Sequence, residues 1–197
     1  MTPILELRDV SMTYPTGLKA LAGVTVRVDA GERVAVIGRS GAGKSTLLRL
    51  VNRLLTPTSG DILLEGSSIA HVHGRRLREV RTRVGMIFQQ FNLVSRLTVL
   101  ENVLVGWLGG QRGLATAPAL WRWFPRDARE AAMKCLEEVQ IADFADRRAD
   151  QLSGGQAQRV AIARVLAQQP LAILADEPVS SLDPRSSEIV LQTLDHI

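Results

Sequence analysis

A glycine-rich segment that ends in a lysine and two hydroxyl residues is the part of this chain best suited to chemistry. Gly38-Arg39-Ser40-Gly41-Ala42-Gly43-Lys44-Ser45-Thr46, here called the phosphate loop, has the pattern G-x-x-x-x-G-K-[ST]. Glycines at this spacing let backbone N–H groups approach phosphate oxygens, and a helix that follows adds its positive N-terminal end. The segment predicts a polyphosphate site, in preference to an ordinary glycine turn.

Two side chains of the phosphate loop and an acidic pair far along the chain together suit hydrolysis. Lys44 would place its ammonium between the terminal phosphates, and the Ser45 hydroxyl would bind Mg²⁺. Asp176 and Glu177 follow an apolar run, at the strand end where open α/β sheets bind ligands. We expect Asp176 to bind the magnesium ion directly or through one of its ligands, and Glu177 to polarise the attacking water. An Asp-Glu pair alone is commonly a solvated turn, so the catalytic interpretation depends on the phosphate loop.

A second anion site is predicted at Leu152-Ser153-Gly154-Gly155-Gln156, here called the signature segment. Apolar residues at helical spacing follow it, so Ser153 is suited to cap a helix. The exposed N–H groups of that helix end would attract an anion. Taken alone, Ser-Gly-Gly is more often a flexible turn with a helix cap.

Hydrophobic periodicity places these motifs on an α/β fold. Alternating apolar residues predict half-buried antiparallel strands over the first thirty residues, with turns at 15–17 and 30–31. Arg33–Ile37 and Leu171–Ala175 are typical of short strands buried on both faces of a parallel sheet. Helical spacing occurs over Leu97–Trp107 and Arg126–Ile141, and again after Pro184. The stretch 109–125, rich in Gly, Pro and Trp, separates the first two helices.

Length and composition restrict the protein class. The 197 residues suit one domain, and the net charge of +4 is compatible with phosphate ligands or an anionic membrane without selecting either. One cysteine, Cys135, forms no internal disulfide and indicates a reducing compartment. We expect neither an export leader nor a membrane span. His71 and His73 are interpreted as a polar loop, and the basic run 75–83 as a solvated helix face.

Five motifs in order resemble the nucleotide-binding domain of ABC transporters. They are the phosphate loop, Gln89 after Val84–Phe88, the signature segment, Asp176-Glu177-Pro178 and Ser181-Leu182-Asp183. The resemblance covers the whole chain. It implies a P-loop NTPase of the α/β class over residues 1–197, with an antiparallel β subdomain and a helical subdomain at about 92–160.

The resemblance also implies partners and residue roles. It implies a head-to-tail homodimer, in which ATP and Mg²⁺ on one subunit's phosphate loop are capped by the other subunit's signature segment. Tyr14 would stack on adenine, and Gln89 would sense magnesium and the attacking water. Asp183 would couple the two sites. The nucleotide-binding set is then Gly38 to Thr46, Tyr14, Ser153, Gly154, Gly155, Gln156 and Asp183, with Glu177, Gln89 and Lys44 catalytic and Ser45, Gln89 and Asp176 at the metal.

Within that family the chain looks like the phosphonate importers, through Gly85–Val94, Leu97–Leu104, Trp121–Pro125 and Asp176–Asp183. This implies a transport-coupled ATPase on the cytoplasmic face of the bacterial inner membrane, bound to permease subunits and, through them, to a periplasmic substrate-binding protein. Importers for methionine, polar amino acids or phosphate share the segment Phe88–Asn102 and stay as alternatives. A domain that binds only nucleotide never touches the transported molecule, so physics alone does not select the substrate.

The end of the sequence departs from the family pattern. ABC domains continue into a strand that ends in a histidine at the γ-phosphate, and His196 lies instead in the helix expected after Pro184. We therefore expect a truncated chain whose hydrolysis is weakened more than its nucleotide binding. A non-hydrolysing remnant is one alternative. Another is a soluble ABC ATPase acting on DNA or ribosomes, but the chain lacks the coiled coils or paired cassettes of such proteins, and no nucleic acid is expected.

Overall fold

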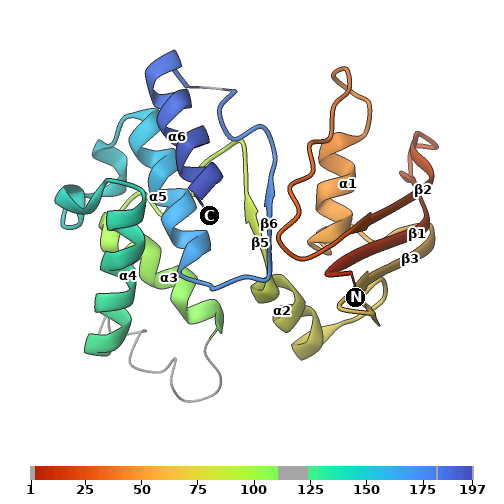
Figure 1. Ribbon diagram of the computed structural model, residues 1–197, viewed down its shortest axis with the longest axis horizontal. Helices are drawn as coiled ribbons and strands as arrows, with labels where there is room; N and C mark the ends of the chain where they lie inside the picture. The colour runs from red at the N-terminus through yellow and green to blue at the C-terminus, as the bar shows by residue number, and fades with distance from the viewer. Residues whose placement is uncertain (1–2, 111–123, 181, 197) are drawn as a thin grey trace. The chain divides into compact units, whose positions relative to one another are not determined.

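The computed structural model describes residues 3–110, 124–180 and 182–196 (Figure 1). The chain divides into two compact units, Met1–Val84 and Gly85–Ile197, which are described separately below. Most of the tryptophan-containing stretch 121–125, on which the resemblance to phosphonate importers mainly rests, lies outside the described residues, as does Ser181.

The first unit contains the antiparallel sheet that the alternating apolar residues predict. Its strands are β1 (Leu5–Thr13), β2 (Lys19–Val28), β3 (Ser59–Leu64) and β4 (Ser67–Ser68), in the order β2-β1-β3-β4. All three pairings are antiparallel, with Leu7 opposite Val26 on one side and Ile62 on the other. The turn after β1 is closed by Tyr14 N–H donating to the Leu18 carbonyl at 2.9 Å. The prediction of an N-terminal β region is confirmed.

Two helices accompany this sheet. α1 (Lys44–Val51) begins inside the phosphate loop, approaches β2 and buries Leu50. α2 (Gly74–Arg83) carries the basic run, most of which is exposed. The helix expected after the phosphate loop is therefore confirmed, and the basic run forms the solvated helix face that we predicted.

The strand expected over Arg33–Ile37 is not formed. Residues 33–37 have no regular secondary structure, and Val34, Val36 and Ile37 are 50%, 44% and 93% exposed. A parallel strand needs neighbouring strands to accept and donate its backbone hydrogen bonds. Among the residues of the first unit that the structure describes, the sheet holds only β1 to β4, all paired antiparallel. The apolar run alone was insufficient to make a strand here.

The second unit is mainly helical. Its helices are α3 (Val99–Gly110), α4 (Arg126–Glu138), α5 (Gly154–Leu166) and α6 (Pro184–His196), with short 3-10 turns η3 (Ala142–Phe144) and η4 (Ala149–Gln151). α5 packs against α3, α4 and α6 (Figure 1). The core contains fully buried side chains from each of these helices: Val99, Leu104, Leu136, Ile162 and Val190. The three predicted helical stretches are confirmed, with α3 beginning two residues later and α4 ending three residues earlier than expected.

Two neighbouring strands, β5 (Val84–Ile87) and β6 (Ala172–Ala175), complete this unit. The Asp176 N–H donates to the Ile87 carbonyl at 2.9 Å. Ile87 ends β5 and Asp176 directly follows β6, so the two carboxyl ends lie at the same edge, as in a parallel pair. The strand predicted at 171–175 exists, but its expected full burial is wrong. Leu171 is 40% exposed and the four β6 residues are half-buried, because the elements packed on the faces of β6 cover them only in part.

Among the residues described, no helix is both long and apolar enough to cross a lipid bilayer.

Candidate functional site

The backbone of the phosphate loop accepts hydrogen bonds from the loop's own lysine. Lys44 Nζ donates to the carbonyls of Gly38 at 2.9 Å and Arg39 at 3.1 Å, while the Ala42 N–H donates to Arg39 O at 3.1 Å. The ammonium is therefore held inside the segment that is predicted to cradle phosphate. Hydrogen bonds between ionised groups are stronger than those to a neutral carbonyl, so a phosphate oxygen would compete well for this ammonium.

The end of the loop requires a residue without a side chain. Gly43 has φ 89°, and a Cβ there would lie 2.6 Å from the Ala20 carbonyl oxygen and 2.9 Å from Leu21 Cδ2. β2 thus lies against the backbone at the start of α1. No acidic residue occupies the first turn of α1 and no side chain caps it, so the positive end of the helix remains available to an anion.

Tyr14 lies beside the phosphate loop in the first unit. Its hydroxyl shares a 3.0 Å hydrogen bond with the hydroxyl of Thr46, which is 8% exposed. Tyr14 follows β1 directly, so the β1–β2 hairpin positions it. The proximity is compatible with an adenine contact, which stays a prediction.

In the second unit, Gln89 comes after β5 and the acidic pair comes after β6, at the same edge of the two-stranded sheet. Gln89 comes two residues after β5 and is exposed, and Asp176 follows β6 and is 7% exposed. Because Asp176 is bonded to Ile87, the predicted magnesium-sensing glutamine and the predicted magnesium carboxylate both emerge at this edge.

Glu177 combines an exposed carboxylate with an uncommon backbone conformation. Its φ is 49°, in the left-handed region that non-glycine residues seldom adopt. The Ser180 N–H and Oγ both donate to the Glu177 carbonyl, at 3.2 Å and 3.0 Å, and hold the turn. Such conformations cost of order 1–3 kcal/mol and concentrate at functional sites. The observation supports the role predicted for Glu177.

The signature segment forms a complete capping box at the start of α5. The Ser153 N–H donates to Gln156 Oε1 at 2.9 Å, and the Gln156 N–H donates to Ser153 Oγ at 3.3 Å. A Cβ at Gly155 would lie 2.4 Å from Ser186 Oγ, so α6 approaches this turn too closely for any side chain. The Gly154 and Gly155 N–H groups donate to no partner among the described residues, which leaves them for an anion.

Asp183 caps α6. Its Oδ1 accepts from the Ser186 N–H at 3.0 Å, and its carbonyl accepts from the Ser187 N–H at 2.9 Å. Hydrogen bonds from Ser186, first from its side chain and then from its backbone, hold the pKa of the Asp183 carboxyl below its ordinary value. The carboxylate is therefore ionised at neutral pH, and its coupling role stays a prediction.

Two residues that our sequence analysis did not select organise the chain after Gln89. Asn102 on α3 is 1% exposed, and its side chain accepts from Val94 N–H at 2.8 Å and donates to Thr98 O at 2.9 Å. Arg164 on α5 donates to the Phe91 and Asn92 carbonyls. A charged residue inside the otherwise apolar run Val160–Leu166 is the signal that could have identified Arg164.

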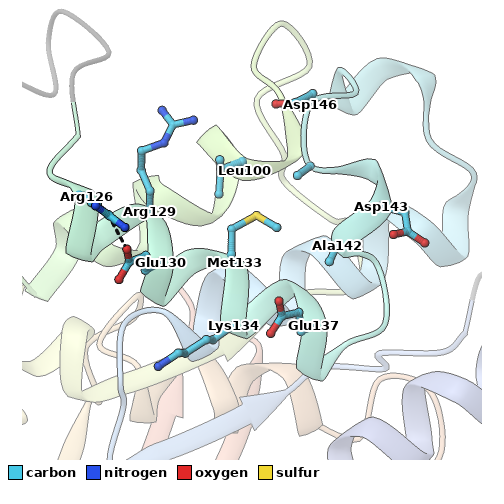
Figure 2. Close-up of a pocket in the computed structure, with 11 residues that line it drawn as sticks. Leu100, Arg126, Arg129, Glu130, Met133, Lys134, Glu137, Ala142, Asp143 and Asp146 are labelled. Atoms are coloured by element: carbon cyan, nitrogen blue, oxygen red, sulfur yellow. Dashed lines mark hydrogen bonds and ion pairs between the residues drawn. The ribbon is translucent and has the colours of Figure 1, made fainter.

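A separate pocket of about 740 Å³ lies on α4 and η3 (Figure 2). Met133 lies between the Arg126–Glu130 ion pair, joined at 2.8 Å, and the carboxylates of Asp143 and Asp146. None of the predicted nucleotide or metal residues lines it.

Within the described ranges, no three His, Cys, Asp or Glu side chains group to hold a metal. The predicted magnesium ligands include one carboxylate, that of Asp176. This suits an ion that takes most of its oxygen ligands from phosphate and water.

Comparison with known proteins identifies a family and individual relatives. The family model described as ABC transporter matches residues 21–180. A phosphonates import ATP-binding protein from Halalkalibacterium halodurans is 50% identical over 97% of this chain and 73% of its own length. One from Bacillus thuringiensis subsp. konkukian is 52% identical over 98% of this chain and 74% of its own.

Solved structures agree with the sequence relatives. The dimeric ATP-binding cassette MJ0796, in a post-hydrolysis state bound to ADP and Pi, has a TM-score of 0.84 and 37% identity, over 96% of this chain and 81% of that one. CbiO1 from Clostridium perfringens, part of the ABC transporter complex cbiONQ, has a TM-score of 0.82 and 30% identity, over 100% and 74%. The chain therefore belongs to the ABC transporter family.

Proposed function

We propose that this chain is the ATP-binding and ATP-hydrolysing subunit of an importer that takes up phosphonate, or a related phosphorus oxyanion. The observation that carries the substrate class is the identity of about half of all residues with phosphonate import ATP-binding proteins over nearly the whole chain. The whole of residues 1–197 acts as one ATP-binding domain, with its helical part at about 92–160. The family match over 21–180 supports that extent.

The phosphate loop binds the ATP polyphosphate. Its N–H groups and the start of α1 provide donors and a positive helix end, and Lys44 exchanges the carbonyls of Gly38 and Arg39 for phosphate oxygens. Tyr14, whose hydroxyl is hydrogen-bonded to that of Thr46 in the same unit, provides an aromatic surface for adenine. Loss of the Lys44 ammonium should therefore weaken ATP binding itself.

Hydrolysis uses the residues that follow β5 and β6. The Glu177 carboxylate orients the attacking water and accepts its proton as the water oxygen bonds to the γ-phosphorus, while the bond from the γ-phosphorus to the bridging oxygen breaks and ADP leaves with that oxygen. Ser45, Gln89 and Asp176 are the side chains that would hold Mg²⁺, which supplies positive charge to the phosphate oxygens. ADP and phosphate are the products. Gln89 senses the metal and the water from the exposed end of β5.

The functional state is a homodimer. The signature segment presents the Gly154 and Gly155 N–H groups at the capped end of α5, and it binds the ATP held by the other subunit. The dimeric state of the MJ0796 cassette supports this arrangement. ATP closes the dimer and hydrolysis reopens it, with Asp183 coupling the two sites.

The dimer acts on the cytoplasmic face of the bacterial inner membrane, as a peripheral partner of transmembrane permease subunits. A periplasmic substrate-binding protein delivers the phosphonate to that permease. The relatives' description as import ATP-binding proteins supports this assembly. No nucleic acid takes part.

Growth of bacteria that lack their own phosphonate import ATPase tests the proposal. The wild-type chain, expressed with the permease and binding protein of a phosphonate importer, should restore growth on a phosphonate as the sole phosphorus source. Glu177→Gln and Lys44→Ala should not. Growth on inorganic phosphate should be equal in all strains. Restored methionine or amino acid uptake without phosphonate uptake would contradict the substrate class.

Turnover of the purified proteins separates the residue roles. Glu177→Gln should bind ATP normally and lose roughly 10²–10⁴-fold in kcat, the usual contribution of a general base. Lys44→Ala should instead raise the Kd for ATP. Near-normal turnover in Glu177→Gln would remove Glu177 as the base, and absence of turnover in the wild-type chain would favour the non-hydrolysing alternative.

A further inference from the structure

The loop that carries Gln89 is tied to α5 by one arginine. Arg164 Nη1 donates to the Asn92 carbonyl at 2.6 Å and Nη2 donates to the Phe91 carbonyl at 2.9 Å. A guanidinium has the planar fork needed to reach two successive carbonyls, whereas a lysine ammonium is a single point of charge. Burial lowers the pKa of the Arg164 guanidinium, so this partly buried charge carries a desolvation cost.

The same loop places an aromatic side chain beside the signature segment. An ideal Cβ at Gly154 would lie 3.7 Å from Phe91 Cζ and 3.6 Å from Leu182 Cδ2, which is ordinary van der Waals contact. The Phe91 ring thus lies beside the turn that begins α5, and its carbonyl accepts a hydrogen bond from Arg164 near the other end of the same helix. One residue, Gln90, separates Phe91 from Gln89.

A third tie holds the far end of the loop. The Asn102 side chain bonds both the N–H and the C=O of Val94, at 2.8 Å and 3.2 Å. The segment from Phe91 to Val94 is therefore fixed to α5 and α3, whereas Gln89 and Gln90 are exposed. A displacement of α5 would consequently move the chain immediately after Gln89.

We infer that Arg164 is a positioning residue that makes Gln89 and the signature segment of one subunit move together. The inference rests on the proposed function, because in the dimer these two elements serve different ATP molecules. Gln89 responds to magnesium and water at its own subunit's nucleotide, and the signature segment caps the nucleotide of the other subunit. The Arg164 fork and the Phe91 contact then form a connection between the two sites that runs inside one subunit.

Arg159 provides a matched control on the same helix. Its Nη1 donates to the Gln140 carbonyl at 2.8 Å, and burial lowers the pKa of its guanidinium too, but it ties α5 to the turn after α4 rather than to the Gln89 loop. Arg159→Lys thus changes one arginine-to-carbonyl bond of α5, and Arg164→Lys removes the fork to two carbonyls of the Gln89 loop. Only the first should affect Gln89.

Hydrogen exchange of the full chain without nucleotide tests the connection independently of any ATPase activity. Arg164→Lys should speed amide exchange in residues 88–94 by about tenfold or more, because opening of that segment becomes easier. Arg159→Lys should leave exchange there unchanged. Equal exchange in residues 88–94 of Arg164→Lys and wild type would overturn the inference even if the chain is an active ATPase.

Kinetics test the consequence for Gln89. Arg164→Lys should lower kcat by about tenfold, leave the KM for ATP within about twofold, and raise the Mg²⁺ concentration needed for half-maximal turnover. In a Gln89→Ala background the same change should lower kcat no further, since residues acting through one another are not additive. Losses that multiply in the double variant would overturn the inference. If Arg164→Lys does not fold, Phe91→Leu replaces it, because this change removes the aromatic ring beside Gly154. Its loss of kcat is then compared in the wild-type and Gln89→Ala backgrounds.

Discussion

Three charged side chains of this chain, Lys44, Arg164 and Asp183, form hydrogen bonds to backbone groups. Lys44 donates to two carbonyls of its own loop, Arg164 donates to two carbonyls of the Gln89 loop, and Asp183 accepts from a backbone N–H of α6. Such a bond can be exchanged for a ligand without leaving an opposite charge unpaired in the interior. At the residue scale, this suits groups that must change partners during a cycle of binding and hydrolysis.

Cys135, the single cysteine, should be unreactive in the folded chain at neutral pH. Burial, and next the charge of Glu138, raise the pKa of its thiol to about 11. The thiolate is the reactive form, so alkylation by iodoacetamide at pH 8 should be roughly a hundredfold slower than in urea. The raised pKa also means that stability should fall as pH rises above the ordinary thiol value toward 11. Equal alkylation rates in the folded and unfolded chain would contradict this account.

At the scale of elements, the start of α5 combines stability with ligand binding. Ser153 and Gln156 satisfy two of the helix-end groups reciprocally, while the two glycine amides between them stay available. The cap therefore fixes the direction of the amides that the other subunit's nucleotide would meet. Gly155 lets α6 approach the same turn, so the cap and the packing of α6 are parts of one arrangement.

Ser153→Ala should lower the free energy of unfolding by about 1 kcal/mol, because the Gln156 N–H loses its acceptor. Urea unfolding measures the change. Ser153→Asn is the control, since asparagine is an equally good N-cap and should restore most of the stability. An Ala variant as stable as wild type would mean that the cap contributes nothing measurable.

At the scale of the whole molecule, the proposed cycle needs two copies of the chain. Each subunit supplies a phosphate loop to one nucleotide and a signature segment to the other, and neither site is complete alone. Glu177→Gln should trap the closed form, because it binds ATP without hydrolysing it.

Size-exclusion chromatography of Glu177→Gln should accordingly show a shift with ATP from the mass of one chain to that of two. Without nucleotide, and with ADP, the variant should elute as one chain. Adding Lys44→Ala should raise the ATP concentration needed for the shift, because ATP binds more weakly. A single-chain mass at saturating ATP would contradict the head-to-tail dimer.

Motifs whose hydrogen bonds join residues close in sequence were predictable from the sequence, because these bonds are local. The phosphate loop, the capping box of α5 and the helix after Pro184 each depend on neighbours within about four residues. The N-terminal hairpin is nearly as local. The order of the motifs along the chain was also enough to indicate the ABC transporter family.

Contacts between distant segments were decided only by tertiary structure. Arg164 meets carbonyls more than seventy residues earlier in the chain, and Ser186 meets Gly155 across a helix packing contact. Arg33–Ile37 has the composition of a buried strand, yet it forms none, because a strand exists only where other strands accept its backbone hydrogen bonds. The sequence by itself thus determined the local chemistry of each motif. Packing decided which motifs are joined, since that depends on which faces and backbone groups lie opposite one another.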